Sequence, residues 1–271
     1  MKRYLTLILI IITIVTSCEE IIDIDLNTSD EGFVVEASVC KDSVSIVRLS
    51  RTVSYFSPEE PSYIEDATVI ISDGTASEQL NYTGNGYYTG SAVRGVEERT
   101  YSIEIIHNGI SYQGSSFMPR EPLINSVSYS KSSSQSILNP FGETVFSIDC
   151  EFSDDINQDN YYLVRFSDSE GSLLERYYLL TEEKTNSGSI EYENGNISFS
   201  ESIFYDGGEI EVKVFAVDEY IYNYFLQLTD VLFWKKRITP PATYNPASNI
   251  NNGALGYFAA WSYDSQMLIL E

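Results

Sequence analysis

The chain has 271 residues and 43% of them are hydrophobic, so it can bury a core and fold as a globular protein rather than remain disordered. Its formal net charge of −24 repels phosphate backbones, which argues against nucleic-acid binding and against docking on anionic lipid through a basic patch. The 21 tyrosines are typical of strands in an all-β secreted protein, and a sugar- or peptide-binding surface is the alternative interpretation.

Residues 1–17 have the layout of a secretory signal peptide. Lys2 and Arg3 give a basic start, and the apolar run from Leu5 to Val15 is too short to cross about 30 Å of hydrocarbon. Val15-Thr16-Ser17-Cys18 then resembles the bacterial lipobox, in which a signal peptidase cuts before the cysteine and the thiol receives a diacylglyceryl group. The resemblance implies that Cys18 is lipidated. An ordinary signal peptide with a chance cysteine is the alternative.

Residues 18–31 are predicted to be an acidic tether. Four carboxylates follow the cysteine within seven residues, namely Glu19, Glu20, Asp23 and Asp25. They resemble the acidic export signal that directs lipoproteins to the outer face of the outer membrane in Bacteroidota. We therefore expect a lipid-anchored protein at the cell surface, and a merely solvated linker is the alternative.

Residues 32–118 are predicted to form an N-terminal β-sandwich domain without a helix. The stretch from Ser43 to Ser50 alternates polar and apolar residues, as a half-buried strand does. Asp73-Gly74 and Asn108-Gly109 are hairpin-turn dipeptides. Short strands with regularly spaced turn signals indicate a sandwich of immunoglobulin or fibronectin-III type. His107 precedes the second turn, and we predict an imidazole at the surface.

The two prolines in Met118–Pro122 mark a domain boundary, and residues 123–271 are predicted to form a second, β-rich sandwich domain. Residues 218–236 are the exception to its β pattern, because their apolar residues recur three and four apart, as on one face of a helix. Asp218 is the expected N-cap, and Lys235, Lys236 and Arg237 suit the C-terminal end. We expect this helix to cover a sheet edge or the domain seam.

Cys40 and Cys150 lie 110 residues apart, one in each predicted domain. An exported protein could join them in a disulfide, but we expect two separate buried thiols.

Residues 155–159 imitate the first half of a calcium loop, and the candidate ligands are Asp155, Asn157 and Asp159 together with the preceding Asp154. An EF-hand requires glycine at the sixth position and glutamate at the twelfth, where this chain has Asn160 and Phe166. A solvated acidic turn is therefore expected, and no metal site or other cofactor is predicted.

No catalytic residue is predicted either. A serine-histidine-aspartate triad would have to use His107, and the chain has no nucleophile-elbow motif around a serine. Nothing among the 40 acidic residues distinguishes a glycosidase pair. We predict a protein that is not an enzyme, with a hydrolase as the minority alternative.

The most distinctive stretch is Asn245–Ala260, where asparagine, proline and glycine make successive tight turns before a final strand that begins at Leu255. This stretch resembles the C-terminal signature of DUF4249, a family of Bacteroidota lipoproteins. Phe33–Ala37 and Gly86-Tyr87-Tyr88 also resemble that family. The resemblance implies a place beside TonB-dependent outer-membrane receptors, and it carries over no catalytic residues.

We therefore predict a non-enzymatic accessory or ligand-capture partner of an outer-membrane β-barrel, of TonB-dependent or another type. A lipoprotein that binds glycans or peptides by itself, through tyrosines exposed on one sandwich face, is the alternative.

Overall fold

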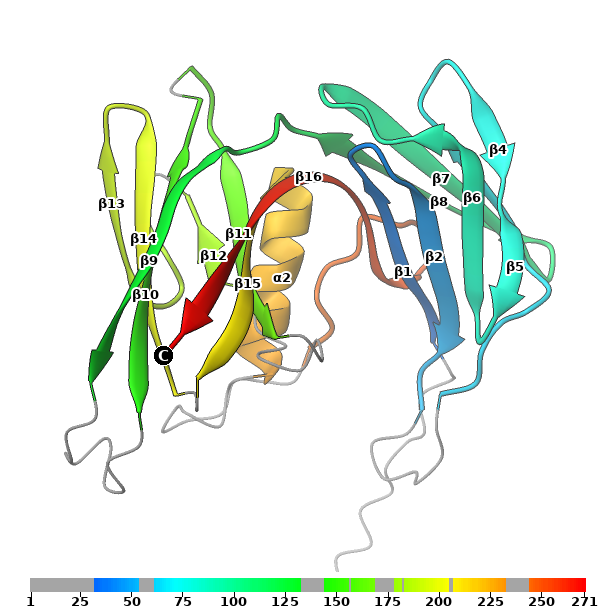
Figure 1. Ribbon diagram of the computed structural model, residues 1–271. Helices are drawn as coiled ribbons and strands as arrows, with labels where there is room; N and C mark the ends of the chain where they lie inside the picture. The colour runs from blue at the N-terminus through cyan, green and yellow to red at the C-terminus, as the bar shows by residue number, and fades with distance from the viewer. Residues whose placement is uncertain are drawn as a thin grey trace, which may run out of the picture. The chain divides into compact units, whose positions relative to one another are not determined.

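The computed structural model describes residues 32–53, 61–132, 144–155, 157–168, 178–181, 183–204, 207–232 and 244–271 (Figure 1). These residues belong to one compact unit, Glu31–Glu271. The fold is mostly β and sandwich-like, as predicted. None of the helices within the described ranges is long and apolar enough to cross a membrane.

The strands of the N-terminal half are β1 (Phe33–Cys40), β2 (Val44–Arg51), β3 (Thr68–Ser72), β4 (Ser77–Gln79), β5 (Asn81–Gly84), β6 (Tyr87–Arg94), β7 (Arg99–His107) and β8 (Ile110–Met118). The later elements are β9 (Ile124–Ser132), β10 (Val145–Ser153), β11 (Tyr161–Asp168), β12 (Tyr178–Leu180), β13 (Ser189–Glu193), β14 (Asn196–Phe204), β15 (Gly208–Val217), α2 (Glu219–Leu232) and β16 (Leu255–Leu270).

The strands form three sheets. One sheet has eight strands in the order β12-β11-β15-β16-β1-β2-β6-β5, and the other two have four strands each, β4-β3-β7-β8 and β13-β14-β10-β9. One cluster of buried side chains comes from β1 to β3 and β6 to β8, with Phe258 and Ala260 of β16. A second cluster comes mainly from β10, β11, β14 and β15. The eight-stranded sheet contributes to both clusters.

The hairpin between β7 and β8 has the predicted turn. Asn108 and Gly109 have φ angles of 51° and 78°, and His107 pairs with Ile110, which closes a two-residue loop. His107 itself is not at the surface, so that prediction was wrong. Only 8% of the residue is exposed, and its Nε2 lies 3.2 Å from Oδ1 of Asp66. Alternate residues of a strand share one face, and His107 follows the buried Ile105 on the inner face.

The last strand, β16, joins both halves of the protein. Its residues Leu255–Trp261 pair in parallel with β1, and Ser262–Leu270 pair antiparallel with β15. The sequence division at residue 123 did not predict that the C-terminal strand also completes the N-terminal half. Gly256 is required at this junction, because its φ is 89° and an added Cβ would lie 2.0 Å from the carbonyl oxygen of Val35.

The segment between Met118 and Ile124 is fastened to β16 where that strand leaves β1. Ser262 Oγ donates a hydrogen bond of 3.0 Å to the carbonyl of Pro119. The backbone N–H of Ile124 donates one of 2.8 Å to Asp264 Oδ2. The proline-containing connection therefore has fixed partners on the strand that both halves share.

The helix α2 begins as predicted. Asp218 Oδ1 accepts a hydrogen bond of 2.9 Å from the backbone N–H of Ile221, so Asp218 is the N-cap. Its other oxygen accepts hydrogen bonds from the hydroxyl of Ser116 and the backbone N–H of Phe117, which ties the start of the helix to β8. The predicted C-terminal residues Lys235, Lys236 and Arg237 lie outside the described residues.

The buried face of α2 packs on the eight-stranded sheet. Ile221 and Phe225 form a third cluster with Phe215 of β15 and Trp261 of β16. The helix therefore covers a sheet face, which includes the strand shared by both halves, rather than a sheet edge. Figure 1 shows α2 beside β11, β15 and β16.

Both described cysteines are free thiols, as expected, but only Cys150 is buried, so the expectation of a buried thiol was wrong for Cys40. Cys150 is buried in the second cluster, and burial raises the pKa of its thiol to about 12. Cys40 is only partly buried and packs against the third cluster, where the indole N–H of Trp261 donates to its sulfur.

Candidate functional site

The residues predicted to carry the lipid anchor lie outside the described residues. They are Val15, Thr16 and Ser17 of the lipobox, Cys18 itself, and Glu19, Glu20, Asp23 and Asp25 of the export signal.

The acidic turn between β10 and β11 is held together by its own side chains. Asp154 Oδ1 accepts hydrogen bonds from the hydroxyl of Tyr162 at 2.5 Å and from Asn160 Nδ2 at 3.0 Å. Asp155 Oδ1 accepts from the backbone N–H and from Nδ2 of Asn157. These donors from Asn157 keep the pKa of Asp155 below its ordinary value.

A cavity of about 500 Å³ lies beside this turn. Asp154, Asp155 and Asn157 line it, whereas the exposed Asp159 does not. Arg120 Nη1 lies 3.9 Å from Asp155 Oδ2. No three histidine, cysteine or acidic residues are grouped for a metal ion within the described parts of the chain. The hydrogen bonds assign these carboxylates the role of holding the turn.

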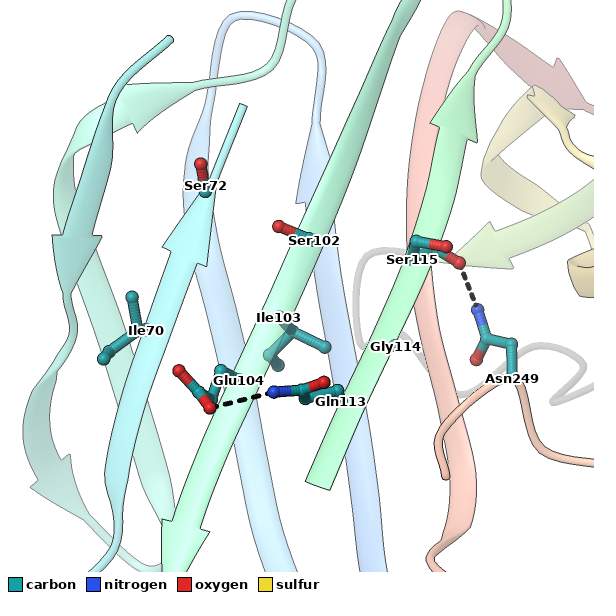
Figure 2. Close-up of a pocket in the computed structure, with 9 residues that line it drawn as sticks. All are labelled: Ile70, Ser72, Ser102, Ile103, Glu104, Gln113, Gly114, Ser115 and Asn249. Carbon is teal, nitrogen blue, oxygen red and sulfur yellow. Dashed lines mark hydrogen bonds between the residues drawn. The ribbon is translucent and has the colours of Figure 1, made fainter. Parts of the chain in front are cut away.

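A second hollow, of about 560 Å³, lies on strands β3, β7 and β8 of one four-stranded sheet (Figure 2). Its lining residues are Ile70, Ser72, Ser102, Ile103, Glu104, Gln113, Gly114, Ser115 and Asn249. None of them was singled out as a site residue from the sequence.

Strand register explains why polar groups gather there. Ser72 pairs with Ser102, which pairs with Ser115, so three hydroxyl-bearing residues form one row across the sheet. Glu104 pairs with Ile70 on one side and with Gln113 on the other. Neighbouring strands lie about 4.8 Å apart, so each row is a closely spaced line of side chains on the face opposite the core.

Glu104 is the acid of this hollow, and its donors come from β8. Its Oε1 accepts hydrogen bonds from Gln113 Nε2 at 3.0 Å and from the hydroxyl of Ser111 at 2.9 Å, the former visible in Figure 2. The Gln113 amide, followed by the Ser111 hydroxyl, lowers the pKa of Glu104. A carboxylate that is held ionised in this way is suited to accept hydrogen bonds, but it is a weak proton acceptor for catalysis.

Asp73 is another acid whose pKa is lowered by hydrogen bonds that stabilise the fold. Asp73 has a pKa of about 2, because the backbone N–H groups of Ala76 and Thr75 donate to it. Arg99 adds an ion pair of 2.8 Å on the same carboxylate. The carboxylates of Asp73 and Glu104 therefore both accept hydrogen bonds from residues close to them in the fold.

Glu78 of β4 reaches across to β6. Its carboxylate accepts hydrogen bonds from three consecutive backbone N–H groups, those of Ser91, Ala92 and Val93. Desolvation by burial favours the neutral form, but these donors outweigh it and lower the pKa of Glu78. The strand pairing of β6 with β2 is irregular at this point, and Glu78 satisfies the N–H groups there.

The distinctive tail signature covers the free edge of β8. Asn251 exchanges backbone and side-chain hydrogen bonds with the backbone of Gln113, and Asn252 Nδ2 donates to the carbonyl of Ser111. Asn249 Nδ2 donates to the carbonyl of Ser115, as Figure 2 shows, and also to that of Phe258. An exposed strand edge is a template for unwanted pairing, so this part of the signature has a structural role.

The sequence contained a weak signal for the hollow. Strands β7 and β8 alternate polar and apolar residues, which predicts one polar face for each. Which serine or glutamine lies beside which depends on register, and register across β3, β7 and β8 cannot be read from one strand alone.

Comparison with known proteins gives one family. A family described as a domain of unknown function (DUF4249) matches residues 19–267. No curated protein matches the chain. Because the match covers most of the sequence, the protein belongs to the DUF4249 family.

Proposed function

We propose that this protein is an outer-membrane lipoprotein of Bacteroidota, anchored through Cys18 and displayed at the cell surface. It acts as a non-enzymatic accessory or ligand-capture partner of an outer-membrane β-barrel, of TonB-dependent or another type. The observation that carries the proposal is the sequence Val15-Thr16-Ser17-Cys18 at the end of an apolar run. The family match begins at residue 19, directly after the cysteine, which supports a mature chain that starts at Cys18.

The described surface supports binding as the role of the β body. The hollow on β3, β7 and β8 presents hydroxyl, amide and carboxylate groups on a sheet face, with Glu104 held ionised by Gln113 and Ser111. Such groups exchange hydrogen bonds with a ligand or a partner without chemistry. We further propose that the two halves are sandwiches of immunoglobulin or fibronectin-III type that share β16.

Metabolic labelling with an alkyne analogue of palmitate tests the anchor. We expect the wild-type protein to be labelled, the Cys18→Ala variant to lose the label, and the matched Cys40→Ala variant to keep it. Label that persists in Cys18→Ala, or its absence from the wild-type protein, would contradict the anchor.

A further inference from the structure

A straight row of four side chains crosses the eight-stranded sheet on the face opposite the first core. Tyr257 of β16 pairs with Glu36 of β1, Glu36 pairs with Arg48 of β2, and Arg48 pairs with Tyr87 of β6. Strands in a sheet lie about 4.8 Å apart, so the row spans about 14 Å with an aromatic ring at each end and a charged pair in the middle.

Arg48 is held in place by two tyrosines. Its guanidinium carbon lies 5.0 Å from the ring centre of Tyr63 and 5.3 Å from that of Tyr87. Its Nη2 donates a hydrogen bond of 2.8 Å to the Tyr63 hydroxyl. Its Nη1 lies 3.7 Å from the carboxylate of Glu36, which is too long for a strong hydrogen bond. The guanidinium is therefore oriented, while the Glu36 carboxylate remains open to another donor.

A hollow of about 160 Å³ lies against this row. The row supplies its polar and aromatic walls, and Ser38 and the exposed Ile46 come from the next row along β1 and β2. On the helix side, the ring of Tyr257 lies 5.1 Å from that of Tyr224 in α2, so the helix supports this wall. The hollow has room for only part of a drug-sized ligand, so a longer ligand would have to continue along the row.

The groups in this row select the class of ligand. Tyr87 is 39% exposed, so a ring is available for stacking against the apolar face of a ligand. Glu36 and Arg48 offer acceptors and donors side by side and cancel each other's charge. The net charge of −24 repels polyanions. A ligand that suits these groups has apolar faces, many hydroxyl groups and no net charge, and a neutral sugar chain has all three properties.

We infer that this hollow and the adjoining row bind a neutral oligosaccharide, with one sugar ring stacked on Tyr87 and its hydroxyls bonded to Glu36 and Arg48. The inference rests on the ligand-capture part of the proposed function and names the ligand class. The larger hollow of Figure 2 is a poorer sugar site, because no aromatic residue lines it.

The test uses the protein extracted from membranes and purified in mild detergent. The probes are linear neutral hexasaccharides of glucose, mannose, galactose and xylose on an array, with hexagalacturonate as the acidic comparison. The tightest neutral binder is then titrated calorimetrically against variants. Tyr87→Ala removes the ring, and Tyr87→Phe keeps it. Tyr192→Ala in β13 is the matched control, because Tyr192 is exposed to a similar degree, 38%.

We expect the wild-type protein to bind at least one neutral hexasaccharide. Tyr87→Ala should weaken that binding about tenfold or more, as loss of a central aromatic contact does. Tyr87→Phe and Tyr192→Ala should leave the affinity within about twofold of wild type. The melting temperature of each variant shows that it is folded, and Tyr87→Phe tests the stacking role independently of any folding loss in Tyr87→Ala.

Three results would overturn the inference: no neutral hexasaccharide binds, the acidic one binds more tightly, or Tyr192→Ala weakens binding as much as Tyr87→Ala. Palmitate labelling of Cys18 in the same preparations separates the two proposals. If the label is present and sugars do not bind, the sugar site is wrong while the anchor stands. If sugars bind and the label is absent, the anchor is wrong while the sugar site stands.

Discussion

Individual acidic side chains in this protein stabilise turns through backbone N–H groups. Asp73 is the clearest case, since one of its oxygens accepts hydrogen bonds from the backbone N–H groups of Thr75 and Ala76 and from the Thr75 hydroxyl. The other oxygen pairs with Arg99. Asp73 and Gly74 are also the dipeptide that predicted this turn from the sequence, so the residue both marks the turn and holds it.

Asp73 should make the stability of the protein depend on pH. Its pKa is about 2 in the folded state against an ordinary value of 3.8, so the stabilisation is present above about pH 4 and is lost as the pH falls towards 2. Asp73→Asn should lower the free energy of unfolding at pH 7 by about 1–2 kcal/mol. The difference between wild type and variant should shrink below pH 4, as measured by urea unfolding.

The exposed Asp159 provides the control for this experiment. Asp159→Asn should leave the free energy of unfolding at pH 7 within about 0.5 kcal/mol of wild type. A difference between wild type and Asp73→Asn that stays constant from pH 7 to pH 2 would show that the charge of Asp73 contributes nothing.

At the scale of elements, the tail signature lies along the free edge of β8, forms hydrogen bonds with it and leads into β16. Asn249 makes three hydrogen bonds, from Nδ2 to the carbonyls of Ser115 and Phe258 and from the Phe258 N–H to Oδ1. One side chain therefore connects the edge of one sheet to the shared strand of another.

Removing that side chain should be costly. Asn249→Ala leaves the partly buried backbone N–H and carbonyl of Phe258 without these partners and removes an exposed hydrogen bond to β8, so we expect a loss of about 2–4 kcal/mol in the free energy of unfolding. Hydrogen exchange at the Phe258 amide should become faster. Asn245→Ala, an exposed position of the same signature, should change the stability by less than about 0.5 kcal/mol. Equal effects at the two positions would contradict the edge-covering role.

Local patterns predicted the elements better than their assembly. The turn at Asn108-Gly109 and the N-cap Asp218 each depend on a few adjacent residues, and both are present as predicted. The alternation predicted for Ser43–Ser50 holds only in part, because Ser45 is buried and Ile46 is exposed beside an irregular pairing with β6. The pairing of Val34 with Leu255 joins residues far apart in the chain, and no local pattern specifies it. The prediction of a surface position for His107 failed for a related reason. The turn was predicted from adjacent residues, but the ring of His107 is covered by Phe33, which lies far away in the sequence.

The same distinction applies to the candidate sites. The sequence identified the acidic turn at Asp154 and Asp155 because its residues are adjacent. The row from Tyr257 to Tyr87 could not be found in this way, since it takes one residue from each of four strands and exists only after β16 pairs with β1.

At the scale of the whole molecule, the protein is a strongly acidic β body whose N-terminal sequence predicts a lipid anchor. The net charge of −24 makes electrostatic adhesion to anionic lipid unfavourable, so the body needs a covalent anchor or a protein partner to stay at a membrane. The proposed capture of ligand above a barrel requires such an anchor and a barrel partner.

The most direct test combines protease shaving of intact cells with crosslinking and a mild-detergent pull-down through a C-terminal tag. The account predicts that shaving removes the tagged protein from intact cells. Without shaving, the pull-down should recover a large β-barrel protein together with it. Protein that resists the protease in intact cells and is recovered alone after crosslinking would contradict both surface display and the partnership with a barrel.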